Sequence, residues 1–280
     1  MPDVDGGLIV KFGFPFISLH PGAWVEVAQA ADEAGFESCW IADHLVFPVE
    51  MEGTLGDVAH PNVPATVPVF DAPAYLSYLA GLTTRINLGV YVYLAGLRHP
   101  FTTARGFATL DRVSNGRALV GVGAGWLRNE WTAAGMDPRT RGRRLDEALD
   151  VCVRLWTEPE VEHHGEFYDF EPVAFEPKPV QQPHPPVLVG GLSDAALRRA
   201  ARFQGWMGMG DTFESVRRAV DRLAELGAPD IEITAQGRCE SHDDLRRWED
   251  AGAHRLVVTP WESTSKAVDS LRRFAERFIA

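Results

Sequence analysis

Residues 86–123 read INLGVYVYLAGLRHPFTTARGFATLDRVSNGRALVGVG and decide the fold. The two ends of this stretch, Ile86–Tyr93 and Arg117–Gly123, are rich in apolar and β-branched residues and are predicted strands. Pro100 begins the helix between them, and Asn115-Gly116 ends it. A strand, a helix and a second strand in this order predict a parallel βαβ unit.

The same alternation continues on both sides of this stretch. Further strands are predicted at 8–17, 38–42, 186–190, 205–209, 230–234 and 255–259, and further helices at 21–35, 71–84, 140–156, 194–203, 213–226, 243–251 and 265–278. About eight strand–helix units close a (β/α)8 barrel, whereas a doubly wound open sheet needs fewer evenly spaced units. We therefore predict an α/β fold, a single (β/α)8 TIM barrel domain over residues 1–280. Two long segments, 45–68 and 158–185, interrupt the rhythm and are predicted insertions with a functional role.

Composition excludes several classes of protein. The chain has 27 basic and 39 acidic residues, a net charge of −12, which repels phosphate backbones and disfavours nucleic-acid binding. Its three cysteines, Cys39, Cys152 and Cys239, are far apart and predict neither a disulfide framework nor a thiolate metal site. The first residues carry no signal-peptide pattern, and no apolar run is long enough to span a bilayer. We expect a cytoplasmic protein without membrane or nucleic-acid partners.

In a barrel of this kind the active site lies at the carboxyl ends of the strands. The residues predicted there are mostly glycines, aromatic and apolar residues: Phe14, Asp43, His44, Tyr91 to Leu94, Ala124, Gly125, Trp126, Gly190, Gly191 and Leu192. They include no cluster of His, Asp and Glu with metal-ligand spacing, so no metal is expected. Such a surface suits a large flat cofactor better than acid–base hydrolysis.

Several of these residues have two interpretations. His44 is either an acid or base that faces the reacting atoms or a loop histidine that is hydrogen-bonded to backbone. Asp43 likewise has a functional interpretation and a structural one, in which it hydrogen-bonds to a neighbouring loop. The glycines of Gly121–Gly125 are interpreted as letting a ligand approach the backbone. Gly190-Gly191 precedes a helix that Ser193 can cap, which makes it a candidate anion site or only a tight turn.

A basic cluster stands out on this acidic chain. It consists of Arg139, Arg141, Arg143 and Arg144. One interpretation is a solvated helix start that is partly paired with neighbouring carboxylates. The other is a docking site for the anionic tail of a ligand.

Several motifs, taken together, resemble one family. They are Ser38-Cys-Trp-Ile-Ala-Asp-His44, Leu97-Arg-His-Pro100, Ala108-Thr-Leu-Asp-Arg-Val-Ser-Asn-Gly-Arg117, Gly121-Val-Gly-Ala-Gly-Trp126 with Asn129-Glu130, and Val187-Leu-Val-Gly-Gly-Leu-Ser193. The chain is similar to the bacterial luciferase-like monooxygenase superfamily from about residue 10 to 210. It resembles most the actinobacterial oxidoreductases that use the deazaflavin coenzyme F420, although relatives that use FMN share most of these motifs.

The resemblance implies a (β/α)8 barrel whose mouth holds the flavin or deazaflavin ring against a bulge in the third strand. This bulge would contain a non-prolyl cis peptide at Tyr91-Val92. By the same resemblance Asp43 would bond the ring or its side chain. The remaining cofactor contacts would be Ala124, Gly125 and Trp126 along the ring and ribityl chain, and Gly190, Gly191 and Leu192 at the phosphate.

One position departs from the family. The sugar-phosphate dehydrogenases carry a catalytic glutamate where this chain has Trp126. Glu130 lies one turn further on and is either a substitute for that glutamate or a helix-surface residue. The departure argues against the sugar-phosphate reaction itself. The segment 45–68 has no Lys or Arg, which also disfavours phosphorylated substrates.

The resulting hypothesis is an oxidoreductase that moves a hydride between C5 of F420 and a small organic substrate. His44 and Glu130 would be the catalytic groups, Phe14, Phe47 and Trp126 the apolar substrate wall, and Arg141 and Arg143 the contacts of the F420 tail. The first alternative is an FMN-dependent monooxygenase served by a separate reductase. The second is a barrel that binds a flavin or deazaflavin without turnover. Family members are often dimers, so we expect a homodimer.

Overall fold

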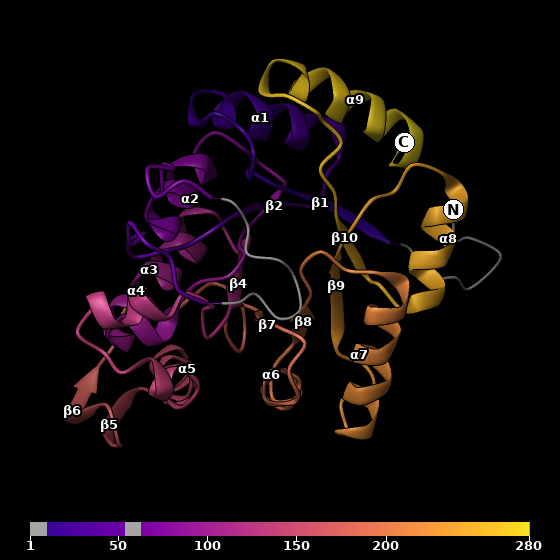
Figure 1. Ribbon diagram of the computed structural model, residues 1–280. Helices are drawn as coiled ribbons and strands as arrows, with labels where there is room; N and C mark the ends of the chain where they lie inside the picture. Colours follow the sequence, from indigo (N-terminus) through magenta and orange to yellow (C-terminus); the bar gives the residue numbers. More distant parts are fainter. Residues whose placement is uncertain (1–9, 54–62, 280) are drawn as a thin grey trace. The chain divides into compact units, whose positions relative to one another are not determined.

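The structure is a computed structural model that describes residues 10–53 and 63–279 (Figure 1). Eight parallel strands pair in the closed order β1-β10-β9-β8-β7-β4-β3-β2. They are β1 (Lys11–Pro15), β2 (Ser38–Ile41), β3 (Asn87–Val90), β4 (Ala118–Val122), β7 (Val187–Gly190), β8 (Gly205–Met207), β9 (Glu232–Gln236) and β10 (Arg255–Val257). The predicted (β/α)8 barrel is confirmed.

Helices follow the barrel strands. They are α1 (Trp24–Ala34), α2 (Ala72–Ala80), α3 (Pro100–Val113), α4 (Arg128–Ala133), α5 (Arg141–Thr157), α6 (Asp194–Ala200), α7 (Phe213–Glu225), α8 (His242–Ala251) and α9 (Ala267–Phe278). Short 3-10 turns occur at Pro21–Ala23, Ala95–Leu97, Pro138–Thr140 and Thr264–Lys266. Within the described residues, no helix combines the length and the apolar character that crossing a bilayer requires.

Residue contacts divide the chain into two compact units. The first contains the described residues of 1–40, 85–87 and 188–280, and the second those of 41–84 and 88–187. In the first unit, β1 lies between β10 and β2, and β7, β8, β9 and β10 pair in turn as parallel neighbours. In the second, β3 pairs with β4. A single domain over residues 1–280 stays a prediction.

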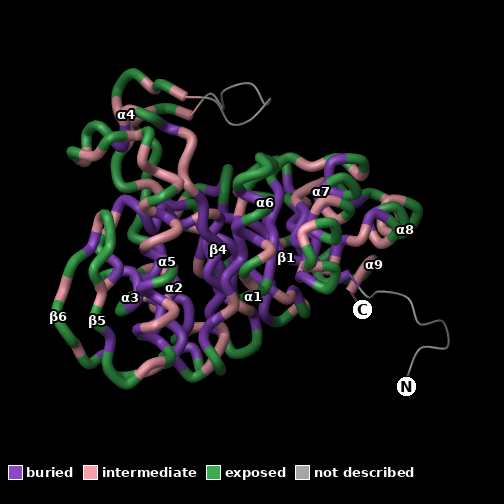
Figure 2. The backbone as a smooth tube through the Cα atoms, turned by 90° about the horizontal axis from the view of Figure 1, so that it is seen from below, coloured by how far each residue is buried: buried purple, intermediate pink, exposed green. Residues whose placement is uncertain are grey.

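Local sequence signals explain where the helices begin and end. Asp71 caps α2 by accepting a hydrogen bond from the backbone N–H of Ala74 at 2.9 Å. Gly35 ends α1 at φ +87°, a left-handed conformation that suits glycine. Thr212 and Ser215 form a reciprocal capping box at the start of α7. In Figure 2 the barrel strands are largely buried, and exposed residues are common on the helices and loops.

The structure differs from the sequence prediction at three places. β3 ends at Val90 rather than Tyr93, and the Tyr91-Val92 peptide that follows it is cis, as the resemblance implied. The segment 158–185 contains an unpredicted antiparallel hairpin of β5 (Glu160–His164) and β6 (Asp169–Ala174). The short helix α4 was also not predicted. Parts of two predicted segments, residues 8–9 and 54–62, lie outside the described residues.

A buried charge cluster stabilises the amino ends of the strands in the first unit. The Arg255 side chain, 2% exposed, pairs with Glu37 at 2.6 Å and with Glu232 at 2.5 Å. Its Nη1 also donates to the Thr234 hydroxyl at 2.9 Å. A charge network at this end of a barrel stabilises the fold, because the active sites of such barrels lie at the opposite end.

Candidate active site

The second unit contains an imidazole–carboxylate pair in which the carboxylate is buried and the imidazole is half-buried. His44 follows β2, and Glu130 is in the first turn of α4 with a fully buried side chain. His44 Nδ1 lies 2.9 Å from Glu130 Oε2. Glu130 Oε1 accepts hydrogen bonds from the backbone N–H groups of Leu45 at 2.6 Å and Val46 at 3.4 Å. Glu130 therefore holds both the imidazole ring of His44 and the backbone that follows His44.

This arrangement favours one tautomer of His44. An ionised carboxylate only accepts hydrogen bonds, so opposite an ionised Glu130 the proton of the His44 ring is on Nδ1. The other ring nitrogen, Nε2, is then left as a base. The ring is 14% exposed and contacts Phe47 at a centroid distance of 4.3 Å and Trp126 at 6.1 Å. The pair can accept a proton from a bound molecule or return one to it.

Asp43, the residue before His44, makes a different pair. Both of its carboxylate oxygens accept hydrogen bonds from the Arg98 guanidinium at 2.8 Å, and Oδ2 also accepts from the Leu94 N–H at 3.0 Å. Burial disfavours the charge on Arg98, but the Asp43 carboxylate outweighs it and raises the pKa of Arg98. Arg98 also lies 4.3 Å from the ring centroid of Tyr93. The structure gives Asp43 the role of holding the loop after β3, and its contact with a cofactor stays a prediction.

The end of β3 is fastened to β4 through glycines. The Tyr93 N–H donates to the Gly121 carbonyl at 2.7 Å, and the Gly123 N–H donates to the Tyr93 carbonyl at 3.2 Å. A Cβ on Gly123 would lie 2.5 Å from a methyl group of Val92. Glycine at 123 thus makes room for the Val92 side chain. The sequence interpretation explained this glycine by the close approach of a ligand and did not include packing against Val92.

The predicted substrate contact Phe14 is a core residue. It is fully buried in the first unit, where its ring makes edge contacts with Phe16 at 5.2 Å, Phe36 at 5.9 Å and Trp261 at 5.8 Å. A side chain without exposed surface cannot touch substrate in this conformation. We do not include Phe14 in the proposed site.

The predicted phosphate segment is in the first unit. Ser193 caps α6 by accepting from the Ala196 N–H at 3.2 Å, as expected. Gly191 adopts φ +118°, its N–H donates to the Met207 carbonyl at 3.2 Å, and its carbonyl accepts from the Trp206 indole at 2.8 Å. The Gly191 N–H is therefore engaged within the protein. Phosphate binding at Gly190, Gly191 and Leu192 stays a prediction.

All four arginines of the basic cluster have partners within the second unit. Arg143 pairs with Glu166, Arg139 with Asp137 at 2.7 Å, Arg141 with the Pro138 carbonyl at 3.0 Å, and Arg144 with the Thr140 hydroxyl at 3.1 Å. Arg144 also lies 4.3 Å from the ring centroid of Phe167. These contacts favour the interpretation as a solvated helix start, and the role of Arg141 and Arg143 toward an F420 tail stays a prediction.

The second unit therefore brings together His44, Glu130, Phe47 and Trp126. Sequence reasoning missed Arg98, although the Leu97-Arg-His-Pro100 motif contains it. A buried carboxylate such as Asp43 needs a cationic partner, and this requirement is the signal that would have found it. Across residues 10–53 and 63–279, no group of three or more metal-ligating side chains occurs.

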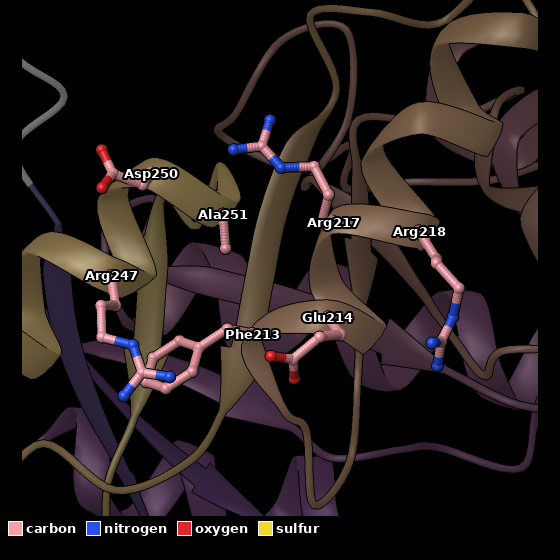
Figure 3. Close-up of a pocket in the computed structure, with 7 residues that line it drawn as sticks. All are labelled: Phe213, Glu214, Arg217, Arg218, Arg247, Asp250 and Ala251. Atoms are coloured by element: carbon pink, nitrogen blue, oxygen red, sulfur yellow. The ribbon is translucent and has the colours of Figure 1, made fainter.

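A hollow of about 410 Å³ lies in the first unit, between α7 and α8 (Figure 3). It is lined by Phe213, Glu214, Arg217, Arg218, Arg247, Asp250 and Ala251. The Arg247 guanidinium covers the Phe213 ring at 3.8 Å from its centroid, as Figure 3 shows. The hollow contains none of the predicted site residues.

A parallel barrel with a half-buried histidine paired to a buried carboxylate after one of its strands is an arrangement that barrel enzymes use. The profile of the family described as luciferase-like monooxygenase matches residues 17–277, so the chain belongs to this family.

Relatives with known activities use two different cofactors. The chain is 32% identical to an uncharacterized protein of Mycobacterium tuberculosis over 262 residues, 90% of this chain and 91% of that protein. It is 30% identical to the FMNH(2)-dependent dimethylsulfone monooxygenase of Pseudomonas putida, over 81% of this chain and 60% of the relative. It is 34% identical to the F420-dependent glucose-6-phosphate dehydrogenase of Kineococcus radiotolerans, over 61% of this chain and 47% of the relative.

Solved structures show the same fold. The monooxygenase RslO1 from Streptomyces bottropensis matches with a TM-score of 0.78 and 22% identity, over 96% of this chain and 99% of that one. An F420-dependent secondary alcohol dehydrogenase in complex with an F420–acetone adduct matches with a TM-score of 0.76 and 16% identity, over 96% of this chain and 99% of that one. Membership of this family supports an oxidoreductase.

Proposed function

We propose that the protein is an oxidoreductase that transfers a hydride between C5 of coenzyme F420 and a small organic substrate. The observation that carries this proposal is the His44–Glu130 pair. Adding a hydride to a carbonyl carbon leaves negative charge on the oxygen, and removing one from an alcohol requires loss of the hydroxyl proton. A base with a fixed tautomer serves both directions of this reaction.

The roles of the two residues follow from their contacts. His44 Nε2 would take the hydroxyl proton of an alcohol or return it to the oxygen of a carbonyl compound. Glu130 would orient the imidazole through Nδ1 and stabilise the imidazolium that forms, because its carboxylate is buried at 2.9 Å from that atom. F420, when bound, supplies the hydride acceptor or donor.

The residues near the pair fit a neutral, flat ring. Val92, Ala124, Gly125 and Trp126 are half-buried, and none of them is charged. The Trp131 indole nitrogen is buried without a hydrogen-bond partner among the described residues, 3.2 Å from where a Cβ on Gly125 would lie. A cofactor with polar atoms beside Gly125 would meet an unsatisfied donor. We propose that Asp43 and Tyr91 contact this ring. We also propose that Gly190, Gly191 and Leu192 contact the phosphate of F420 and that Arg141 and Arg143 contact its tail.

The second candidate is an FMN-dependent monooxygenase. It is favoured by the similarity to the FMNH(2)-dependent enzyme of Pseudomonas putida, which covers 81% of this chain. Such an enzyme would need a separate reductase to supply reduced flavin. We keep F420 as the first choice, because a hydride transfer uses the proton-handling pair directly.

Titration of the purified apoprotein with F420 and with FMN tests the choice of cofactor. Quenching of tryptophan fluorescence reports binding, and Trp126 beside His44 is one of the emitters concerned. We expect tighter binding of F420, and clearly tighter binding of FMN would overturn the proposal. His44→Ala then separates enzyme from carrier: we expect turnover to fall by about 10²–10⁴-fold with little change in cofactor affinity. Bound cofactor without turnover of any alcohol or ketone would favour the non-catalytic alternative.

We also propose a homodimer as the functional assembly. Family resemblance supports it, and sedimentation at several protein concentrations tests it. A monomer at micromolar concentration would contradict it.

A further inference from the structure

The segment that follows the catalytic histidine exposes aliphatic side chains. We define the 44–53 segment as residues 44–53, all of them described. Its aliphatic surface consists of Leu45, Val46 and Val49, which are 44%, 46% and 90% exposed. Single exposed apolar residues are ordinary, but three within five positions directly after His44 are a concentration of exposed apolar side chains that can mark a binding surface.

The segment is held in place at both ends by the start of α4. Glu130 accepts from the N–H groups of Leu45 and Val46, as described above. Asn129 accepts from the Glu52 N–H at 3.2 Å and donates to the Glu50 carbonyl. The Arg128 N–H donates to the Glu52 carbonyl at 2.7 Å. These contacts fix the backbone, so the exposure of the aliphatic side chains is a feature of an ordered segment.

Gly53 explains how close the two pieces of chain lie. It pairs with Leu127 in an isolated antiparallel bridge. It adopts φ +154°, and a Cβ at this position would lie 2.0 Å from the Trp126 carbonyl oxygen. Only glycine allows this approach, which fastens the segment beside Trp126.

The charge on the 44–53 segment disfavours anions. It carries two carboxylates, Glu50 and Glu52, and no lysine or arginine. Arg98 of the Leu97-Arg-His-Pro100 motif is a half-buried cation, but its guanidinium is paired with the Asp43 carboxylate. Arg128 is exposed in the first turn of α4 and is the cation of that turn. It could attract an anionic substrate, so a test of the segment must exclude this effect.

We propose that the aliphatic surface of the 44–53 segment contacts the substrate and selects a neutral, mainly aliphatic alcohol or carbonyl compound over a carboxylated or phosphorylated one. This inference rests on the proposed function, because it names the substrate class of the same site. Each substrate methylene that this surface covers raises kcat/KM by about threefold to fourfold. A carboxylate at the far end of the substrate meets Glu50 and Glu52 and loses this gain.

The experiment compares 2-butanone, 2-octanone and 7-oxooctanoate, first for binding and then for turnover. Saturation-transfer NMR with the cofactor-loaded protein measures binding without any reaction, and reduction with reduced F420 measures kcat/KM. We expect 2-octanone to exceed both 2-butanone and 7-oxooctanoate by at least about tenfold. Equal values for 2-octanone and 7-oxooctanoate would overturn the inference.

Val49→Lys tests the surface itself. The side chain is exposed, so the substitution leaves the core intact, and Val113→Lys at the end of α3, where the valine is 54% exposed, is the matched control. We expect Val49→Lys to lower the preference for 2-octanone over 7-oxooctanoate by about tenfold and Val113→Lys to leave it unchanged. Equal effects of the two variants would overturn the inference, as would a preference for 7-oxooctanoate that Arg128→Ala abolishes.

The two proposals fail in different ways. Selective binding of 2-octanone without hydride transfer would refute the proposed reaction and leave the surface supported. Hydride transfer without a preference for the neutral substrate would refute the surface and leave the reaction supported.

Discussion

Glu130→Gln tests the proposed catalytic pair of His44 and Glu130 most directly. The substitution keeps the shape of a fully buried side chain and replaces one carboxylate oxygen by an NH2 group. If the remaining oxygen keeps the hydrogen bond from the Leu45 N–H at 2.6 Å, the NH2 group faces His44 Nδ1. Two donors cannot share that contact. His44 must then move its proton from Nδ1 to Nε2.

The size of the effect follows from this change of tautomer. Nε2 loses the lone pair that accepts the substrate proton, and a buried negative charge no longer stabilises the imidazolium. Loss of a positioned acid or base costs about 10²–10⁴-fold in turnover. A wrong tautomer alone has cost about 10⁴-fold in serine proteases, where an aspartate that orients a histidine was replaced by asparagine. The free energy of unfolding should fall by only about 1–3 kcal/mol, because the shape and one acceptor remain.

Two measurements check this prediction. The ¹⁵N shifts of the His44 ring report which nitrogen is protonated, and they need no substrate. Steady-state kinetics with F420 and a secondary alcohol report kcat and KM. Glu147→Gln is the matched control, because Glu147 also accepts from a histidine, His163 at 3.1 Å, and from the Phe167 and Tyr168 N–H groups. It should lower stability without changing turnover.

The reasoning is refuted if Glu130→Gln leaves the His44 ¹⁵N shifts unchanged. It is also refuted if the tautomer changes but turnover stays within about threefold of the unmodified protein, since proton transfer at His44 would then contribute little. A fall in turnover that Glu147→Gln reproduces would mean that both effects come from stability alone.

Three further predictions follow from charged groups. Replacing Arg141 and Arg143 by serine should weaken F420 binding several-fold at low salt and hardly affect FMN; fluorescence titrations at rising ionic strength should show the difference shrink, and an unchanged F420 affinity would remove both residues from the site. Arg98→Met leaves the Asp43 carboxylate buried without its cation and should lower the free energy of unfolding by about 3–5 kcal/mol in urea, an unchanged midpoint being the contrary result. Burial raises the pKa of Asp211 from its ordinary 3.8 to about 6, so the folded protein binds this proton more tightly than the unfolded chain and loses stability as pH rises through that window. Asp211→Asn should remove about 2 kcal/mol of that loss in denaturation curves at pH 4 and pH 7, and an identical pH dependence would contradict it.

The order of strands and helices was predictable because it depends on local patterns. The run from Ile86 to Gly123 has strand-like ends, a helix-opening proline and a glycine stop, and each signal acts within a few residues. Repetition of that unit predicts a closed barrel, which the strand pairing confirms. The position of the cis peptide at Tyr91-Val92 came from the resemblance to the family, and no local propensity indicates it. The sequence did not indicate the hairpin of β5 and β6, because its strands are polar and largely exposed and because Glu147 of α5 fastens the turn between them.

Contacts between residues that are far apart in the sequence were decided only by the tertiary structure. Sequence placed His44 at a strand end and left Glu130 open between catalysis and a helix surface; the fold brings these residues, 86 positions apart, to 2.9 Å. Sequence likewise read Phe14 as a substrate contact, whereas its neighbours in space bury it completely. Periodicity specifies which side of a helix or strand is apolar, but a hydrogen bond depends on distances of a few tenths of an ångström between elements. Those distances arise only when all the elements pack, so the contact between His44 and Glu130 is a product of the tertiary structure and not of the motifs.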